Sequence, residues 1–95
     1  MKVIWAELAL QDIEEIWAYI ARDSRASATK TIGKIRHAAR RLIQHPETGR
    51  PGRAAGTREL VVPGTPYILP YRMKGNALEI LAVIHGKQNY PGPTS

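Results

Sequence analysis

The side chains with the clearest capacity for acid–base or phosphate chemistry lie in the second half of the chain. His85 ends an apolar run, and histidine is the side chain that changes charge near neutral pH. Arg58 and Arg72 precede it, and a guanidinium group holds a phosphate through two parallel hydrogen bonds. Tyr90 follows in a polar tail, where its ring can stack on a base. These residues are therefore candidates for contacting a nucleic acid.

Each candidate also has a structural interpretation. The spacing of His85 alone favours a half-buried histidine that closes a strand. Arg58 can instead be partly buried against a carboxylate such as Glu59 or Glu79, and Tyr90 can pack back onto the protein. Both interpretations stay open at this point.

Three more cations lie near these candidates in the sequence. Arg50 and Arg53 precede Arg58, and Lys87 follows His85. A concave rim would suit an RNA or DNA backbone if it brought together Arg50, Arg53, Arg58, Arg72, His85 and Lys87. The alternative is a scatter of solvated charges, which we favour for Arg50 and Arg53.

The remaining residues indicate neither a metal site nor a cofactor site. His37 and His45 have no carboxylate or second histidine at ligand spacing, and the chain contains no cysteine. The lack of cysteine excludes disulfides and is compatible with a reducing cytoplasm, where we expect the protein to act. No phosphate-binding loop, dinucleotide fingerprint or nucleophile elbow is present.

Length and charge limit the classes of protein further. The 95 residues suffice for one domain, expected over residues 1–91 and followed by a flexible tail over 92–95. The formal net charge of +6 favours a nucleic acid, an acidic protein or an anionic membrane as the partner. No apolar run approaches the length needed to cross a membrane.

The first half of the chain predicts a strand and two helices. A short strand is expected at Lys2–Trp5, followed by a helix whose apolar residues recur at helical spacing from Leu10 to Ile20. Ser24 is a good N-cap for a second helix, and Pro46 ends it. A short link joins the helices, so they should form an antiparallel hairpin.

The second half predicts three strands. Residues 45–56 are rich in Gly and Pro and indicate a loop, whereas 58–62, 67–73 and 77–84 are β-rich runs separated by tight turns. Such strands are antiparallel, and the first strand can join the same sheet. We therefore expect an α+β domain of order β-α-α-β-β-β, with the helix hairpin packed on a small antiparallel sheet. Pro70 requires an edge position or a bulge, since it cannot donate to a sheet.

These residues resemble a known superfamily. The segments ALQDIEEIWAYIARDS, GTRELVVPGTPYILPYR and LEILAVIHGKQNYP are similar to the RelE/ParE superfamily of toxins from type II toxin–antitoxin modules, over Val3 to Pro91. The resemblance implies an antiparallel sheet with an N-terminal helix hairpin, in agreement with the pattern of the residues.

The resemblance implies one of two targets. Relatives like RelE cut mRNA on the ribosome, and under that alternative Arg58, Arg72, His85 and Tyr90 would be the catalytic set. Relatives like ParE inhibit DNA gyrase by binding it. The lysine pair of the nuclease branch is missing here, and the HGKQNYP ending looks more like ParE, so we favour the gyrase inhibitor. A degenerate relative that only binds its antitoxin is a third hypothesis.

Either branch implies a cognate antitoxin as partner, with operator DNA bound only through that antitoxin. A partly disordered acidic segment of the antitoxin would fold on this basic protein, along the helix hairpin or by strand addition at a sheet edge. Trp17 and Tyr19 are candidate anchors for it, although Trp17 is better explained as a core residue.

Overall fold

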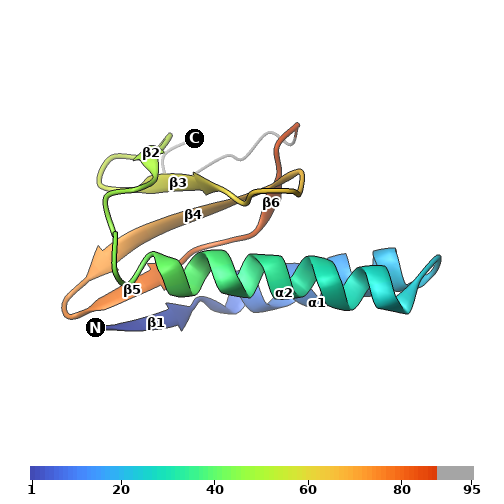
Figure 1. Cartoon of the computed structure of the whole chain (residues 1–95). Helices are drawn as coiled ribbons and strands as arrows, with labels where there is room; N and C mark the ends of the chain where they lie inside the picture. Colours follow the sequence, from blue (N-terminus) through green and yellow to red (C-terminus); the bar gives the residue numbers. More distant parts are fainter. Residues whose placement is uncertain (88–95) are drawn as a thin grey trace.

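Two antiparallel helices pack on one face of a six-stranded sheet in the computed structural model, which describes residues 1–87 (Figure 1). The expected α+β class is confirmed, and the expected elements occur in the expected order, together with two additional two-residue strands. None of the helices in the described part of the chain is long and apolar enough to cross a membrane. The elements are β1 (Lys2–Trp5), α1 (Glu7–Ala21), α2 (Arg25–Arg41), β2 (Arg50–Pro51), β3 (Arg58–Val61), β4 (Tyr67–Lys74), β5 (Ala77–Ile80) and β6 (Ile84–His85).

The helices form where the apolar spacing and the cap predict them. Ser24 caps α2, because its Oγ accepts a hydrogen bond from the Ser27 amide at 3.1 Å. In α1 the buried positions are Ala9 and Ile13. Leu10, expected in the core, is 48% exposed, because Ala9 and not Leu10 falls on the side of α1 that faces the sheet.

The sheet has the order β1-β5-β4-β3-β2, with β6 added beside β4. The hairpin-connected strands are antiparallel as expected, but β1 pairs with β5 in parallel. No tight turn fixes the direction of β1, since two helices separate it from the other strands. The predicted loop over 45–56 contains the two-residue strand β2, which pairs with β3.

The predicted third strand over 77–84 is interrupted by a β-bulge. Tyr71 pairs with Ile80, and Ile68 pairs with Ile84. Three residues of one strand, 81–83, therefore face the two residues 69 and 70 of β4. The Leu81 amide donates to the Pro70 carbonyl at 2.8 Å, so the side of Pro70 that lacks an N–H faces the bulge. Of the two positions expected for Pro70, an edge or a bulge, the structure shows the bulge.

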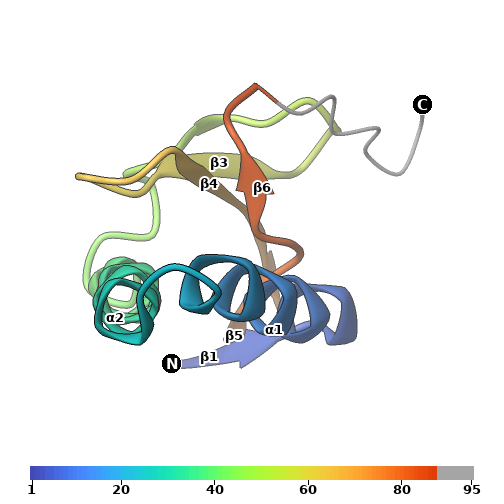
Figure 2. The same ribbon diagram turned by 90° about the vertical axis from the view of Figure 1, so that its right-hand side faces the viewer.

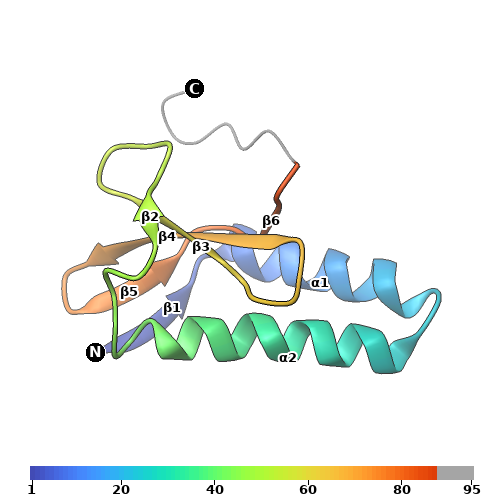
Figure 3. The ribbon, with the colours of Figure 1, turned by 45° about the horizontal axis from the view of Figure 1, so that its top comes forward.

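Tyr71 fastens the segment after α2 to the sheet. Its side chain is buried, and its hydroxyl donates to the Pro46 carbonyl at 2.6 Å and accepts from the Gly49 amide at 2.9 Å. A Cβ at Gly49 would lie 2.7 Å from that hydroxyl oxygen, so this close approach requires glycine. Figure 3 shows the segment running from the end of α2 up to β2.

Replacing Tyr71 by phenylalanine should therefore destabilise the protein with little change in packing. The variant leaves the buried Gly49 amide and the Pro46 carbonyl without their partner, which costs about 2 kcal/mol of unfolding free energy. Urea denaturation measures this loss. Tyr19→Phe is the matched control, because Tyr19 is 70% exposed and its change should stay within about 0.5 kcal/mol. Equal stabilities of Tyr71→Phe and the wild type would contradict the role of the hydroxyl.

Candidate functional site

Arg58 holds the loop that precedes β3. Its Nη1 donates to the Gly49 carbonyl at 2.8 Å and to the Glu47 carbonyl at 3.3 Å. Arg58 is thus hydrogen-bonded to backbone carbonyl oxygens. It does not pair with Glu59 or Glu79, the two carboxylates that the sequence suggested. The guanidinium is committed to the fold.

Glu59 forms ion pairs with Arg50 and Arg53, the two arginines that were expected to be solvated. Its side chain is 3% exposed, and its carboxylate lies 3.5 Å from Arg50 Nη2 and 3.4 Å from Arg53 Nε. The Arg53 amide also donates to it at 3.1 Å. A buried carboxylate needs such partners, since an unpaired charge is costly away from water. The side chains of Arg50 and Arg53 are thus solvated as expected, at 57% and 38% exposure, but they are not scattered, because both pair with Glu59.

Arg72 and His85 lie at opposite ends of β4. Arg72 pairs with Glu79 at 2.8 Å, and with Arg58 it lines a cavity of about 400 Å³. His85 is paired with Tyr67, which puts it roughly 16 Å from Arg72 along the strand. The structure thus brings the two arginines near each other and leaves the histidine apart. The single cationic rim is not formed by the described residues, and Tyr90 lies outside them.

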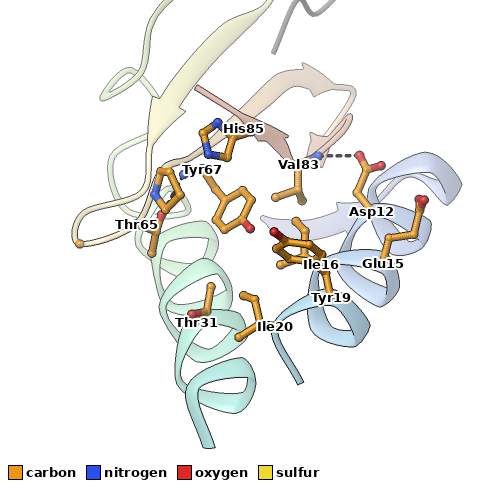
Figure 4. A pocket seen from close by; sticks show the side chains of 12 residues that line it. Asp12, Glu15, Ile16, Tyr19, Ile20, Thr31, Thr65, Tyr67, Val83 and His85 are labelled. Carbon is orange, nitrogen blue, oxygen red and sulfur yellow. Dashed lines mark hydrogen bonds between the residues drawn. The ribbon is translucent and has the colours of Figure 1, made fainter. Parts of the chain in front are cut away.

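His85 contributes to a second, larger cleft. This cleft has a volume of about 660 Å³ and lies between α1, the β3–β4 turn and β6 (Figure 4). The ring of His85 stands edge-on to Tyr67, with centroids 5.9 Å apart, and its Nδ1 accepts a hydrogen bond from the Lys87 amide. The lining includes acidic, aromatic and aliphatic side chains: Asp12, Glu15, Ile16, Tyr19, Ile20, Thr31, Tyr67, Val83 and His85.

Asp12 ties the cleft to the bulge. Its Oδ2 accepts a hydrogen bond from the Val83 amide at 2.9 Å. Val83 lies in the bulge, so Asp12 takes the place of an acceptor in the sheet. Burial raises the pKa of Asp12 above its ordinary value of 3.8, the Val83 hydrogen bond opposes this, and the charge of Glu15 adds to it. Burial likewise raises the pKa of Tyr67, so its hydroxyl is neutral at physiological pH. The wall formed by α1 carries two carboxyl groups, those of Asp12 and Glu15.

The two predicted anchors differ in position. Tyr19 is 70% exposed and lines the cleft. Trp17 is half-buried against the core, and the Arg25 guanidinium lies 5.6 Å from the centre of its ring. Tyr19 is thus available to a partner, whereas Trp17 is explained by packing. Within residues 1–87, no cluster of three or more His, Asp or Glu side chains is placed to hold a metal ion.

The family of the chain follows from its sequence. A family model described as "ParE toxin of type II toxin-antitoxin system, parDE" matches residues 3–90. The chain belongs to the ParE toxin family. It is therefore a toxin of a type II toxin–antitoxin system, and such a system implies a cognate antitoxin.

Individual relatives agree with the ParE family. The chain is 41% identical over 90 residues to the putative toxin Y4kP of Sinorhizobium fredii, covering 95% of this chain and 93% of that protein. It is 31% identical over 84 residues to the toxin RelE2 of Caulobacter vibrioides, covering 88% of this chain and 93% of that protein.

Solved structures share the fold. The chromosomal ParDE system from P. aeruginosa matches with a TM-score of 0.81 and 27% identity, over 90% of this chain and 95% of that one. A YoeB/ParE toxin from Agrobacterium tumefaciens matches with a TM-score of 0.66 over 95% of this chain and 100% of that one, and at 20% identity it supports the fold alone.

Sequence reasoning about this ParE family chain missed Asp12. The residue lies on a helix among other acids, and its partner is 71 positions further along the chain. No local pattern reports such a contact. A weak signal was available, because the bulge expected at Pro70 frees a backbone amide that needs an acceptor.

The charge of Asp12 makes stability depend on pH. The folded-state pKa lies above the ordinary 3.8, so the folded chain binds this proton more tightly and ionisation costs folding free energy. The cost is absent below pH 3.8 and grows as pH rises through the folded-state pKa. Asp12→Asn keeps an acceptor for Val83 and removes the charge. Its stability relative to wild type should therefore increase from pH 3.8 toward neutrality.

Urea denaturation of both proteins at a series of pH values measures the difference. Asp12→Ala is the informative comparison, because it also removes the acceptor and should lose about 1–3 kcal/mol through the unsatisfied Val83 amide. A stability difference between Asp12→Asn and the wild type that is flat with pH would contradict the assigned cause.

Proposed function

We propose that this toxin inhibits DNA gyrase by binding it, without a catalytic site of its own. The observation that carries the proposal is the separation of His85 from the two nuclease-type arginines. Arg58 is bonded to loop carbonyls and Arg72 to Glu79, and His85 lies at the far end of β4. Cleavage of RNA needs its acid–base group and its charge-stabilising group within reach of one phosphate. Membership of the ParE family supports the same conclusion.

A ribosome-dependent mRNA endonuclease is the second candidate. The similarity to a protein named toxin RelE2 favours keeping it. In that case Arg58 and Arg72 would have to leave their present partners to stabilise the developing charge on the phosphate. His85 would serve as the acid or base, and Tyr90 would stack on the nucleotide.

We also propose that the cognate antitoxin docks in the cleft beside α1. Tyr19 offers a large exposed ring there, and Ile16 and Tyr67 supply further apolar surface. Aromatic rings of this kind are common anchors in interfaces. Asp12 and Glu15 on the same wall favour a segment that presents a Lys or Arg beside its apolar residues. This differs from the sequence-based expectation of an acidic segment over the whole contact.

Two assays on purified protein separate the candidate targets. We expect loss of gyrase supercoiling and intact mRNA in an in vitro translation reaction. His85→Ala should retain inhibition within about threefold, because interface energy is spread over several residues. Cut mRNA with normal supercoiling, abolished by His85→Ala, would establish the endonuclease instead. Normal supercoiling, intact mRNA and normal growth on expression would indicate a non-toxic relative that only binds its antitoxin.

The antitoxin site is tested by Tyr19→Ala. Truncation of an exposed anchor should weaken antitoxin binding about tenfold or more while leaving the unfolding free energy within about 0.5 kcal/mol of wild type. Isothermal titration with the antitoxin encoded beside this toxin measures the affinity. Val61→Ala is the control, because Val61 is also exposed, at 50%, but does not line the cleft. Equal weakening by both variants, or by neither, would place the antitoxin elsewhere.

A further inference from the structure

The solvent side of α2 is strongly basic. Between Arg25 and Arg41 the helix carries six of the chain's 14 Lys and Arg residues, together with His37, and no Asp or Glu. None of the ion pairs among residues 1–87 involves an α2 cation. Figure 2 looks along the helix and shows it at a corner of the molecule, with its outer side uncovered by other elements.

Five of these six cations form two rows along this outer side. One row has helical spacing over a rise of roughly 16 Å and consists of Lys30, Lys34 and Arg41, with His37 on the same line. The second row contains Arg36 and Arg40, one turn apart. Successive residues of an α-helix are about 100° apart, which separates the two rows by roughly 110° around the axis. Gly33 lies between them.

Gly33 has no explanation within the fold. It is exposed in the middle of α2, where glycine costs about 1 kcal/mol relative to alanine. A Cβ built at this position meets no heavy atom within 4 Å, so no neighbour requires its absence. Gly33 also has no positive φ. A glycine that neither packing nor backbone geometry demands is suited to the close approach of a partner.

The composition of the surface distinguishes between partners. The large exposed apolar residues are Met1, Ile4, Leu8, Leu10, Tyr19, Val61 and Met73, and none belongs to α2. A protein partner needs apolar anchors at the centre of its interface. A phosphate backbone needs only cations and close contact. The α2 surface therefore fits a nucleic acid better than an acidic protein segment.

We propose that α2 binds double-stranded DNA, with its two rows of cations on the two phosphate backbones that border one groove. An α-helix is about 10–12 Å across and the major groove about 12 Å wide, so the rows face opposite strands. Gly33 then turns bare backbone toward the groove floor. The contacts are to phosphates, and the binding is sequence-independent. This inference does not depend on the proposed gyrase target or on the antitoxin cleft, because it uses other residues.

Fluorescence anisotropy with a labelled duplex of about two helical turns tests the proposal over a range of salt concentrations. Wild-type protein should bind with micromolar affinity near 0.1 M salt, and the affinity should fall steeply as salt rises. The double variant Arg36→Gln/Arg40→Gln should reduce the slope of log affinity against log salt by about 2 and weaken binding about tenfold. Absence of duplex binding by wild type at low salt would overturn the proposal.

A charge-matched control separates a site from a general effect of net charge. Lys2→Gln/Lys74→Gln also removes two positive charges, but from β1 and β4 and not from α2. Its affinity should stay within about twofold of wild type. An equal loss in both double variants would overturn the assignment of the site to α2.

Two variants of Gly33 test the close approach. Gly33→Ala and Gly33→Leu should both raise the melting temperature by about 5 °C, because both residues favour helix over glycine. Alanine adds one methyl group on the groove side and should weaken binding about threefold, whereas leucine should weaken it about tenfold by holding the helix away from the groove. Wild-type affinity in the leucine variant would overturn the groove geometry.

Competitors identify the class of polyanion. A single-stranded RNA or a polyglutamate of the same charge should displace the duplex only at about tenfold higher concentration. Displacement by either at equal concentration, lost in Arg36→Gln/Arg40→Gln, would overturn the assignment to duplex DNA. RNA would then point to a single-strand surface, and polyglutamate to an acidic protein segment.

Discussion

Pro70 imposes the constraint on which the site side of the molecule depends. It lies within β4 but cannot donate a hydrogen bond, so the partner strand is interrupted between β5 and β6. Without the extra residue, the register of Tyr71 with Ile80 would place Ile84 opposite Tyr67. With it, Ile84 turns into a small core cluster beside Ile68, and His85 turns to the cleft. One missing donor thus decides which side chain faces the cleft.

The same interruption adds a hydrogen bond that ties α1 to the sheet, beside the packing of Ala9 and Ile13 in the core. The bulge turns the Val83 amide away from β4, and Asp12 accepts it from the helix side. This position desolvates the Asp12 carboxylate, and desolvation raises its pKa. Asp12 therefore has two roles, since it bonds the bulge and also lines the cleft with a carboxyl group. The bulge that accommodates Pro70 thus helps to determine which groups line the cleft.

Local patterns in the sequence predicted the elements, and long-range pairing escaped them. The Ser24 cap, the apolar spacing of α2 and the bulge at Pro70 each follow from a few neighbouring residues. The parallel pairing of β1 joins parts of the chain that are far apart, and no local pattern specifies it. The partners of the arginines were not predictable either. Glu59 becomes buried only once β2 pairs with β3, and burial is what makes it attract Arg50 and Arg53.

Ion pairing also separates structural cations from those available to a partner. The carboxylates of Glu59 and Glu79 in the sheet pair with Arg50, Arg53 and Arg72, so these arginines explain part of the high charge without implying a ligand. Among residues 1–87, the cations of α2 form no ion pair with a carboxylate. The α2 surface and the cleft adjoin at the β3–β4 turn, where Lys34 Nζ lies 3.4 Å from the carbonyl of Gly64, a residue of the cleft. If the antitoxin and DNA bind where we propose and contact each other at this turn, linkage requires that each changes the affinity of the other by the same factor.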